Sequence, residues 1–289
     1  MRSVTAALAA ILSLLLIGVA VPAIWADRSI VSEGGFTALA APIGSDPTFQ
    51  AALVKASGEA VTNQLHLAAP LAGLVAPIIE GATGALAKDP GYPAAWAETL
   101  RRSHRLTLAD TQDPNQALQL DVQPMLALLA TKLAGSGADV SLPAQVPLSI
   151  GTVSQRQAIL KTARYSPLGY AVAAAGALLF LLALLAARRR SAVLFGCGIG
   201  VLALAGGWTL LLAAAQRAAA ASSAGNSVAD LFKHQFIRAA ANSFNGWIAA
   251  ALVTGAVLVV LGALLGVIRL VVARGTRGRD GAAAARPVE

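Results

Sequence analysis

The stretch Leu168–Ala215, "LGYAVAAAGALLFLLALLAARRRSAVLFGCGIGVLALAGGWTLLLAAA", decides the fold class, because three consecutive arginines separate two long apolar runs. The runs Leu168–Ala187 and Ala192–Ala215 carry no charged residue. An α-helix rises ~1.5 Å per residue and needs about 20 residues to cross ~30 Å of hydrocarbon. Each run is therefore long enough to span a membrane, with Arg188, Arg189 and Arg190 in the loop between them.

Two further uncharged runs of similar length, Val4–Trp25 and Gly246–Ile268, bring the number of candidate spans to four. The 289-residue chain is 56% hydrophobic and only 12% charged, which is too apolar for an ordinary soluble domain. We predict a mostly α membrane protein with four transmembrane helices plus a small α+β extracytoplasmic domain.

The distribution of charge predicts the orientation. Residues 27–165 carry 10 Lys/Arg and 11 Asp/Glu, and residues 216–245 have a net charge of +2. The remaining ends and loop carry a net +7 of the total +8. Cytoplasmic segments are enriched in Lys and Arg. We therefore expect a multi-pass protein of the cell membrane with both termini and the triple-arginine loop in the cytoplasm, and no nucleic-acid partner.

These spans and charges divide the chain into four expected parts: an N-terminal transmembrane anchor at 1–26, an extracytoplasmic α+β domain at 27–166, three transmembrane helices at 167–272, and a disordered cytoplasmic tail at 273–289. A cleaved signal peptide is the alternative for the first part, because Val21-Pro22-Ala23 resembles a cleavage site. The apolar run Ala69–Ala87 contains two prolines and Glu80, so we predict a buried or membrane-lying helix there instead of a fifth span.

The region 27–166 is expected to contain helices and two short strands. Ser45-Asp46-Pro47 predicts the start of a helix over 47–65, and "DPGYP" at 89–93 predicts a turn before the next helix. Apolar and polar residues alternate around 118–122 and 146–150, on either side of a helix at 124–134. This order fits a small βαβ unit, whose strands run parallel. A further helix is expected over 154–164.

The stretch "WAETLRRSHR" at 96–105 holds the candidate functional residues Trp96, Arg101 and His104. On a helix, Trp96, Leu100 and His104 share one face, which indicates a structural helix that buries the tryptophan. The alternative makes His104 a base or phosphate ligand beside Arg101 and Arg105. No nucleophile or orienting partner has a recognisable spacing, so we predict no catalytic residue. The three histidines are scattered, and no cofactor motif is present, so we expect no metal and no cofactor.

Two motifs of small residues predict close helix packing in the third and fourth spans. They are Gly196-x-x-x-Gly200 and Gly262-x-x-x-Gly266. Before the fourth span, residues 227–244 predict an outer amphipathic helix, with Val228, Leu231, Phe232 and Phe236 along one face. That face suits either the membrane interface or the underside of the extracytoplasmic domain.

The pattern Trp96-x4-Arg101-x2-His104, followed by "LQLDVQPMLALLATKL" and "LPAQVPLSI", resembles a family of uncharacterised actinobacterial integral membrane proteins. Leu100 stands where that family often has asparagine. The resemblance implies a topology, namely an N-terminal anchor, an extracytoplasmic domain and C-terminal membrane helices, and it implies no activity.

Three functions are compatible with these observations. The first is a non-catalytic envelope accessory or scaffold that presents its extracytoplasmic domain. The second is a component of a lipid-handling transporter, and the third is a membrane enzyme acting on envelope lipid or glycan through His104, Arg101 and Arg105. The expected partners are membrane lipids and either an envelope protein or a second copy of the chain.

Overall fold

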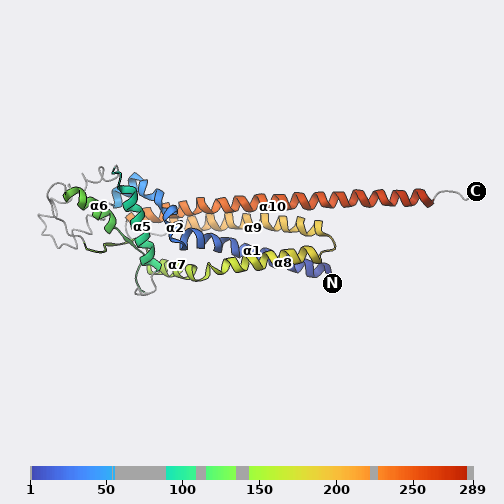
Figure 1. Cartoon of the computed structure of the whole chain (residues 1–289), viewed down its shortest axis with the longest axis horizontal. Helices are drawn as coiled ribbons and strands as arrows, with labels where there is room; N and C mark the ends of the chain where they lie inside the picture. Colours follow the sequence, from blue (N-terminus) through green and yellow to red (C-terminus); the bar gives the residue numbers. More distant parts are fainter. Residues whose placement is uncertain are drawn as a thin grey trace, which may run out of the picture. The chain divides into compact units, whose positions relative to one another are not determined.

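The computed structural model describes residues 2–53, 55, 89–108, 115–134, 143–221 and 227–284, and the chain divides into two compact units. We call the first the span unit; it comprises Met1–Ile24, Leu168–Leu212 and Phe244–Glu289. The second, the core unit, comprises Trp25–Pro167 and Ala213–Ser243. Figure 1 shows the helices of both units.

Four helices are long and apolar enough to cross a membrane, as predicted. They are α1 (Arg2–Ala26), α8 (Leu168–Ala186), α9 (Arg190–Ala220) and α10 (Ser227–Ala284). Large apolar side chains such as Leu8, Leu185 and Val253 are more than 60% exposed on them. A surface of this kind is expected where the solvent is hydrocarbon.

Side-chain hydrogen bonds to backbone carbonyls join the helices of the span unit. The Ser13 hydroxyl of α1 donates to the carbonyl of Gly176 in α8 at 2.7 Å, and the Trp208 indole of α9 donates to the carbonyl of Gly18 in α1 at 3.1 Å. Both donors lie in apolar helices, where an unpaired polar group is costly. These bonds therefore fix which faces of α1 meet its neighbours.

Glycines bring α9 and α10 into backbone contact, at Gly262 of the second predicted motif and at Gly198, which belongs to neither motif. A Cβ added to Gly198 would lie 2.6 Å from the Val259 nitrogen and 2.8 Å from the Gly255 carbonyl oxygen. One at Gly262 would lie 2.5 Å from the Phe195 nitrogen.

The other three glycines of the predicted motifs behave differently. Gly200 lies against the Leu14 side chain of α1, while Gly196 and Gly266 have no described neighbour within 4 Å at that position. One glycine of each motif therefore lies at a close helix contact, Gly262 against α9 and Gly200 against α1.

Helix α10 corrects two expectations. It runs without interruption from Ser227, so the predicted amphipathic helix and the fourth span are one element. It also continues to Ala284, well into the segment predicted to be disordered from residue 273. Alanine and arginine are abundant in that segment and favour helix, which offsets its glycines.

The core unit is built from short helices with side-chain caps. They are η1 (a π-helix, Asp27–Val31), α2 (Glu33–Ala40), η2 (a 3₁₀ helix, Ala41–Ser45), α5 (Tyr92–Leu108), α6 (Gln123–Ala134) and α7 (Val153–Tyr165). Ser32 caps α2, Thr152 and Gln155 form a capping box at α7, and Asp46 accepts a bond from the Phe49 nitrogen at the start of helix 47–53.

The turn at 89–91 and the helices near 124–134 and 154–164 confirm their predictions. The run Ala69–Ala87 lies outside the described residues.

The two strands, β1 (Gln119–Asp121) and β2 (Pro147–Ser149), form an antiparallel pair, so the predicted parallel βαβ unit is wrong. Asp121 pairs with Pro147, which means that the chain leaves β1 and re-enters β2 at the same end of the ladder. Helix α6 and the segment after it therefore act as one long hairpin connection. A parallel pair would need the connection to cross to the opposite end.

Among the described residues, one hydrophobic core holds the core unit together, and it draws on distant parts of the sequence. Its buried residues are Ala40, Ile43, Phe49, Leu53, Tyr92, Trp96, Leu100, Leu120, Val122, Met125, Leu126, Val146, Ile150, Val228, Ala229 and Phe232. The last three belong to α10. Of the two placements predicted for the amphipathic face, the structure shows packing into this domain.

Candidate functional site

Helix α5 sorts the residues of "WAETLRRSHR" onto two faces. Trp96 and His104 are buried, at 3% and 7% exposure, together with Leu100 and Ser103. Arg101 lies on the other face, with its side chain 41% exposed. The structure therefore confirms the predicted buried face, and it separates Arg101 from the two candidates with which the sequence grouped it.

The exposed face of α5 is an ion-pair network around Glu98. Arg101 lies 3.0 Å and Arg102 3.1 Å from its carboxylate, and Arg105 reaches both Glu98 and Glu33 at 3.4 Å. Partial burial raises the pKa of Glu98, but the hydrogen bonds and charges of the arginines outweigh it and hold that pKa below its usual value. The arginines have carboxylate partners within the chain, which weakens the interpretation that they bind an anionic substrate.

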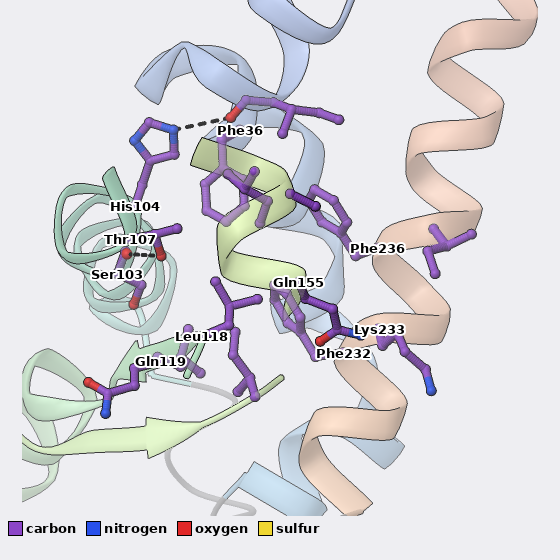
Figure 2. A pocket seen from close by; sticks show the side chains of 16 residues that line it. Phe36, Ser103, His104, Thr107, Leu118, Gln119, Gln155, Phe232, Lys233 and Phe236 are labelled. Atoms are coloured by element: carbon purple, nitrogen blue, oxygen red, sulfur yellow. Dashed lines mark hydrogen bonds between the residues drawn. The ribbon is translucent and has the colours of Figure 1, made fainter. Parts of the chain in front are cut away.

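A partly open cavity of about 300 Å³ lies in the core unit, against the buried face of α5. Figure 2 shows the side chains that line it, which come from η1, α2, α5, α7 and α10 and from β1 and the residues beside the two strands. The residues that line it include Ile30, Phe36, Ser103, His104, Thr107, Gln119, Gln155, Ala158, Phe232, Lys233 and Phe236. The volume is at the lower end of the range for small-molecule sites, about 300–1,000 Å³.

The polar groups of α5 at the cavity are bonded to the protein. The Ser103 hydroxyl donates to the Thr99 carbonyl at 2.6 Å, and the Thr107 hydroxyl donates to the Ser103 carbonyl at 2.8 Å. The His104 Nε2 lies 3.1 Å from the carbonyl oxygen of Ile30. A carbonyl oxygen can only accept, so Nε2 carries the proton and donates. That nitrogen cannot also act as the base of a reaction.

The remaining polar side chains follow the same pattern. Gln155 accepts from the Thr152 nitrogen at 2.9 Å, and Gln119 accepts from Gln116 at 2.9 Å. Lys233, whose side chain is 10% exposed, donates to Asp230 at 3.1 Å. In Figure 2 the amide of Gln119 and the ammonium of Lys233 point away from the middle of the cavity. The wall offered to a ligand is thus almost wholly apolar.

Aromatic rings form the side of the cavity between α5 and α10. Phe36 lies 5.1 Å from the His104 ring and 5.5 Å from Phe236, measured between centroids, and Phe236 stacks on Phe232 at 5.8 Å (Figure 2). Beyond Phe232 the contacts continue through Phe49 to Trp96. Rings at these distances attract one another beyond simple burial. The cavity wall is therefore continuous with the hydrophobic core.

Sequence reasoning missed the aromatic residues Phe36 and Phe232 as cavity residues, and it misplaced Asp121. Alternation in β1 predicts that Asp121 faces solvent, but it is 1% exposed. Its carboxylate accepts from the backbone nitrogens of Gln123 and Val146 at 3.1 and 3.0 Å. The available signal was an aspartate just before a helix, which often accepts backbone N–H groups. The Asp121 carboxylate thus links the start of α6 to the residue before β2.

The described residues contain no group of three or more His, Cys, Asp or Glu side chains arranged to hold a metal ion. No protein-family model, no curated protein and no solved structure matches the chain.

Proposed function

We propose that the protein is a non-catalytic envelope protein of the cell membrane, and that its extracytoplasmic domain, the core unit, accommodates a hydrocarbon chain of a membrane lipid. In this proposal the four apolar helices anchor the chain in the bilayer, with both termini and Arg188–Arg190 in the cytoplasm. The observation that carries the proposal is the cavity at α5, whose polar lining groups are bonded within the protein and whose free wall is apolar.

The size and chemistry of the cavity suit a chain better than a polar ligand. Engineered apolar cavities of about 150 Å³ stay dry and bind benzene, so a volume of about 300 Å³ leaves room for a longer hydrocarbon. Each buried methylene contributes about 0.8 kcal/mol, or about 8 kcal/mol for ten. A polar ligand would gain little, since the hydroxyls of Ser103 and Thr107 already have partners.

The catalytic alternative has less support. Arg101 and Arg105 are held by carboxylates on or beside α5, and the hydroxyls of Ser103 and Thr107 donate to backbone carbonyls, so neither hydroxyl is positioned as a nucleophile for His104. The scaffold hypothesis agrees with the proposal, because a domain that holds a lipid chain can also present it to an envelope partner. Such a partner, or a second copy of the chain, stays a prediction.

Filling the cavity should prevent a lipid chain from entering it. Ala158 and Gln157 of α7 are both exposed, but only Ala158 lines the cavity, where it lies at the open side. The full chain is placed in lipid discs that contain a phospholipid with a photoreactive diazirine on its acyl chain, irradiated and mapped by mass spectrometry. We expect Ala158→Trp to reduce labelling of the peptides of α2 and α7 at least fivefold.

Gln157→Trp is the matched control, because it adds the same side chain to the same helix outside the cavity. It should label α2 and α7 as the unchanged protein does. Labelling of the four spans gives an internal reference in every sample. Equal labelling of the core unit in both variants, or no labelling of it in the unchanged protein, would contradict the proposal.

Reporter fusions test the proposed topology separately. Alkaline phosphatase is active only outside the cytoplasm, so a fusion after residue 140 should be active and a fusion after Arg190 inactive. The reason is the excess of Lys and Arg on the segments assigned to the cytoplasm. The opposite pattern of activities would show that the orientation is inverted.

A further inference from the structure

Two grooves in the span unit flank the turn between α8 and α9. The groove beside α1 has a volume of about 630 Å³ and includes Arg188, Arg189 and Gly196 in its lining. The groove beside α10 has a volume of about 460 Å³ and is lined by Arg189, Ser191, Ala192, Phe195, Gly262, Ala263, Gly266, Arg269 and Leu270. Arg189 lines both grooves, and we call the second one the α10 groove.

The α10 groove combines two arginines with an apolar floor. Arg189 and Arg269 are both exposed, and Arg269 donates one bond, at 3.3 Å, to the carbonyl of Arg188. A guanidinium has five N–H donors, so that bond places Arg269 at the turn and leaves donors for a ligand. Ser191 adds a hydroxyl to the lining. Below these groups, Phe195, Leu270 and the open face of Gly266 provide room for a chain.

The charges around the groove are of one sign. The sequence has no Asp or Glu in residues 1–24, 168–212 or 244–279, so the span unit offers its arginines no carboxylate before Asp280. Helix α9 begins at Arg190, and the start of a helix carries a partial positive charge. An anionic ligand is therefore the kind of partner that the arginines of the α10 groove would bind. Arginine is well suited to phosphate, because its planar fork can donate two parallel bonds.

Both arginines stand directly after an apolar run. Arg188–Arg190 follow Leu168–Ala187, and Arg269 follows Gly246–Ile268. A helix that spans the bilayer places such residues at the level of the lipid headgroups. A phospholipid has a phosphate at the headgroup level and hydrocarbon chains deeper in the bilayer, which matches the arginines and the apolar floor of the groove. Basic pockets between transmembrane helices are known to favour anionic headgroups.

We infer that the α10 groove binds an anionic phospholipid, with its phosphate between Arg189 and Arg269 and an acyl chain along Phe195 and Gly266. The inference rests on the proposed membrane placement of the four helices, and it is independent of the cavity in the core unit. It assigns to the triple-arginine turn a specific lipid contact in addition to its part in orienting the chain.

Native mass spectrometry of the full chain in mild detergent tests the inference, with phosphatidylglycerol and phosphatidylcholine of identical acyl chains as the two probes. A basic residue at the headgroup level contributes about 1 kcal/mol, which corresponds to about fivefold in affinity. Both lipids carry the phosphodiester, but the ammonium of phosphatidylcholine opposes the arginine charges, so we expect phosphatidylglycerol to bind about fivefold more tightly. Arg189→Gln and Arg269→Gln should each weaken it about fivefold.

Two matched variants make the test specific. Arg190→Gln removes the same charge from the same turn but does not line the groove, and it should change the affinity less than twofold. Gly266→Leu should fill the α10 groove and weaken binding, while Gly196→Leu in the other groove should not.

Three results would overturn the site. The first is equal affinity for the two lipids, which would show that the groove does not select an anionic headgroup. The second is a loss in Arg190→Gln as large as in Arg189→Gln, which would indicate diffuse surface charge. The third is displacement of phosphatidylglycerol by 10 mM inorganic phosphate, which would indicate a site for a soluble anion. The diazirine experiment and the fusions do not depend on any of these outcomes.

Discussion

Replacement of Trp96 by alanine is expected to destabilise the core unit by ~3–5 kcal/mol, a large part of the ~5–15 kcal/mol that stabilises a typical domain. The indole is 3% exposed, meets Phe49 edge to face at 5.4 Å, and donates to the Ala40 carbonyl at 3.4 Å. It also lies against Gly44, where a Cβ would collide with the ring. Truncation would therefore leave a cavity that these neighbours cannot close. Scanning calorimetry of the full chain should show a transition lowered by about 10 °C.

Arg101→Ala is the control for this prediction, because Arg101 lies on the same helix, has a side chain that is 41% exposed, and pairs with the partly exposed Glu98. Exposed ion pairs contribute about 0–1 kcal/mol, so its transition should move little. His104→Ala should fall between the two, since it removes a buried ring that contacts Phe36 and Ile30. A stable His104→Ala protein with a null cellular phenotype would contradict the structural role given to this helix.

Gly198→Leu is expected to separate α9 from α10 and to cost roughly 1–3 kcal/mol or more. A Cβ at Gly198 would meet backbone atoms of Val259 and Gly255 at 2.6 and 2.8 Å, and backbone cannot rotate out of the way as a side chain can. Close helix approach is a main source of packing energy in a membrane, where lipid competes equally for apolar surface. The measurement is the temperature at which the full chain aggregates in detergent, which should fall.

Gly196→Leu is the matched control, two residues earlier on the same helix. No described atom lies within 4 Å of a Cβ placed there, so the added side chain enters the groove beside α1. We expect its aggregation temperature to match that of the unchanged protein. Equal losses in the two variants would mean that leucine harms this helix wherever it stands, and that the glycine contact is unimportant.

The elements set by local patterns were predicted well. Long uncharged runs predicted α1, α8 and α9 to within a few residues, except where α9 continues past Ala215 into an alanine-rich stretch. The buried face of α5 followed from the spacing of Trp96, Leu100 and His104. These predictions succeed because hydrophobic length and helical period are properties of neighbouring residues.

Features that depend on distant residues were predicted poorly. The direction of the β1–β2 pair depends on where the connection through α6 returns, which alternation does not reveal. Asp121 is buried because Gln123 and Val146 supply N–H donors, and Val146 is far away in sequence. One wall of the cavity is formed by Phe36 from α2 and Phe236 from α10. The sequence around either phenylalanine does not predict that it contacts the other.

The composition of the hydrophobic core also has a consequence for biosynthesis. Phe49 and Trp96 meet the ring of Phe232, directly or through one another, yet Phe232 is made only after α8 and α9 have been synthesised. At about 5–20 residues per second, the ribosome needs roughly 10–40 s to pass from one segment to the other. During that interval the early helices hold an unfinished apolar surface. The core of this unit can therefore be completed only after the two apolar helices that interrupt it in sequence have been synthesised, and chaperones that protect exposed apolar surface would act within that window.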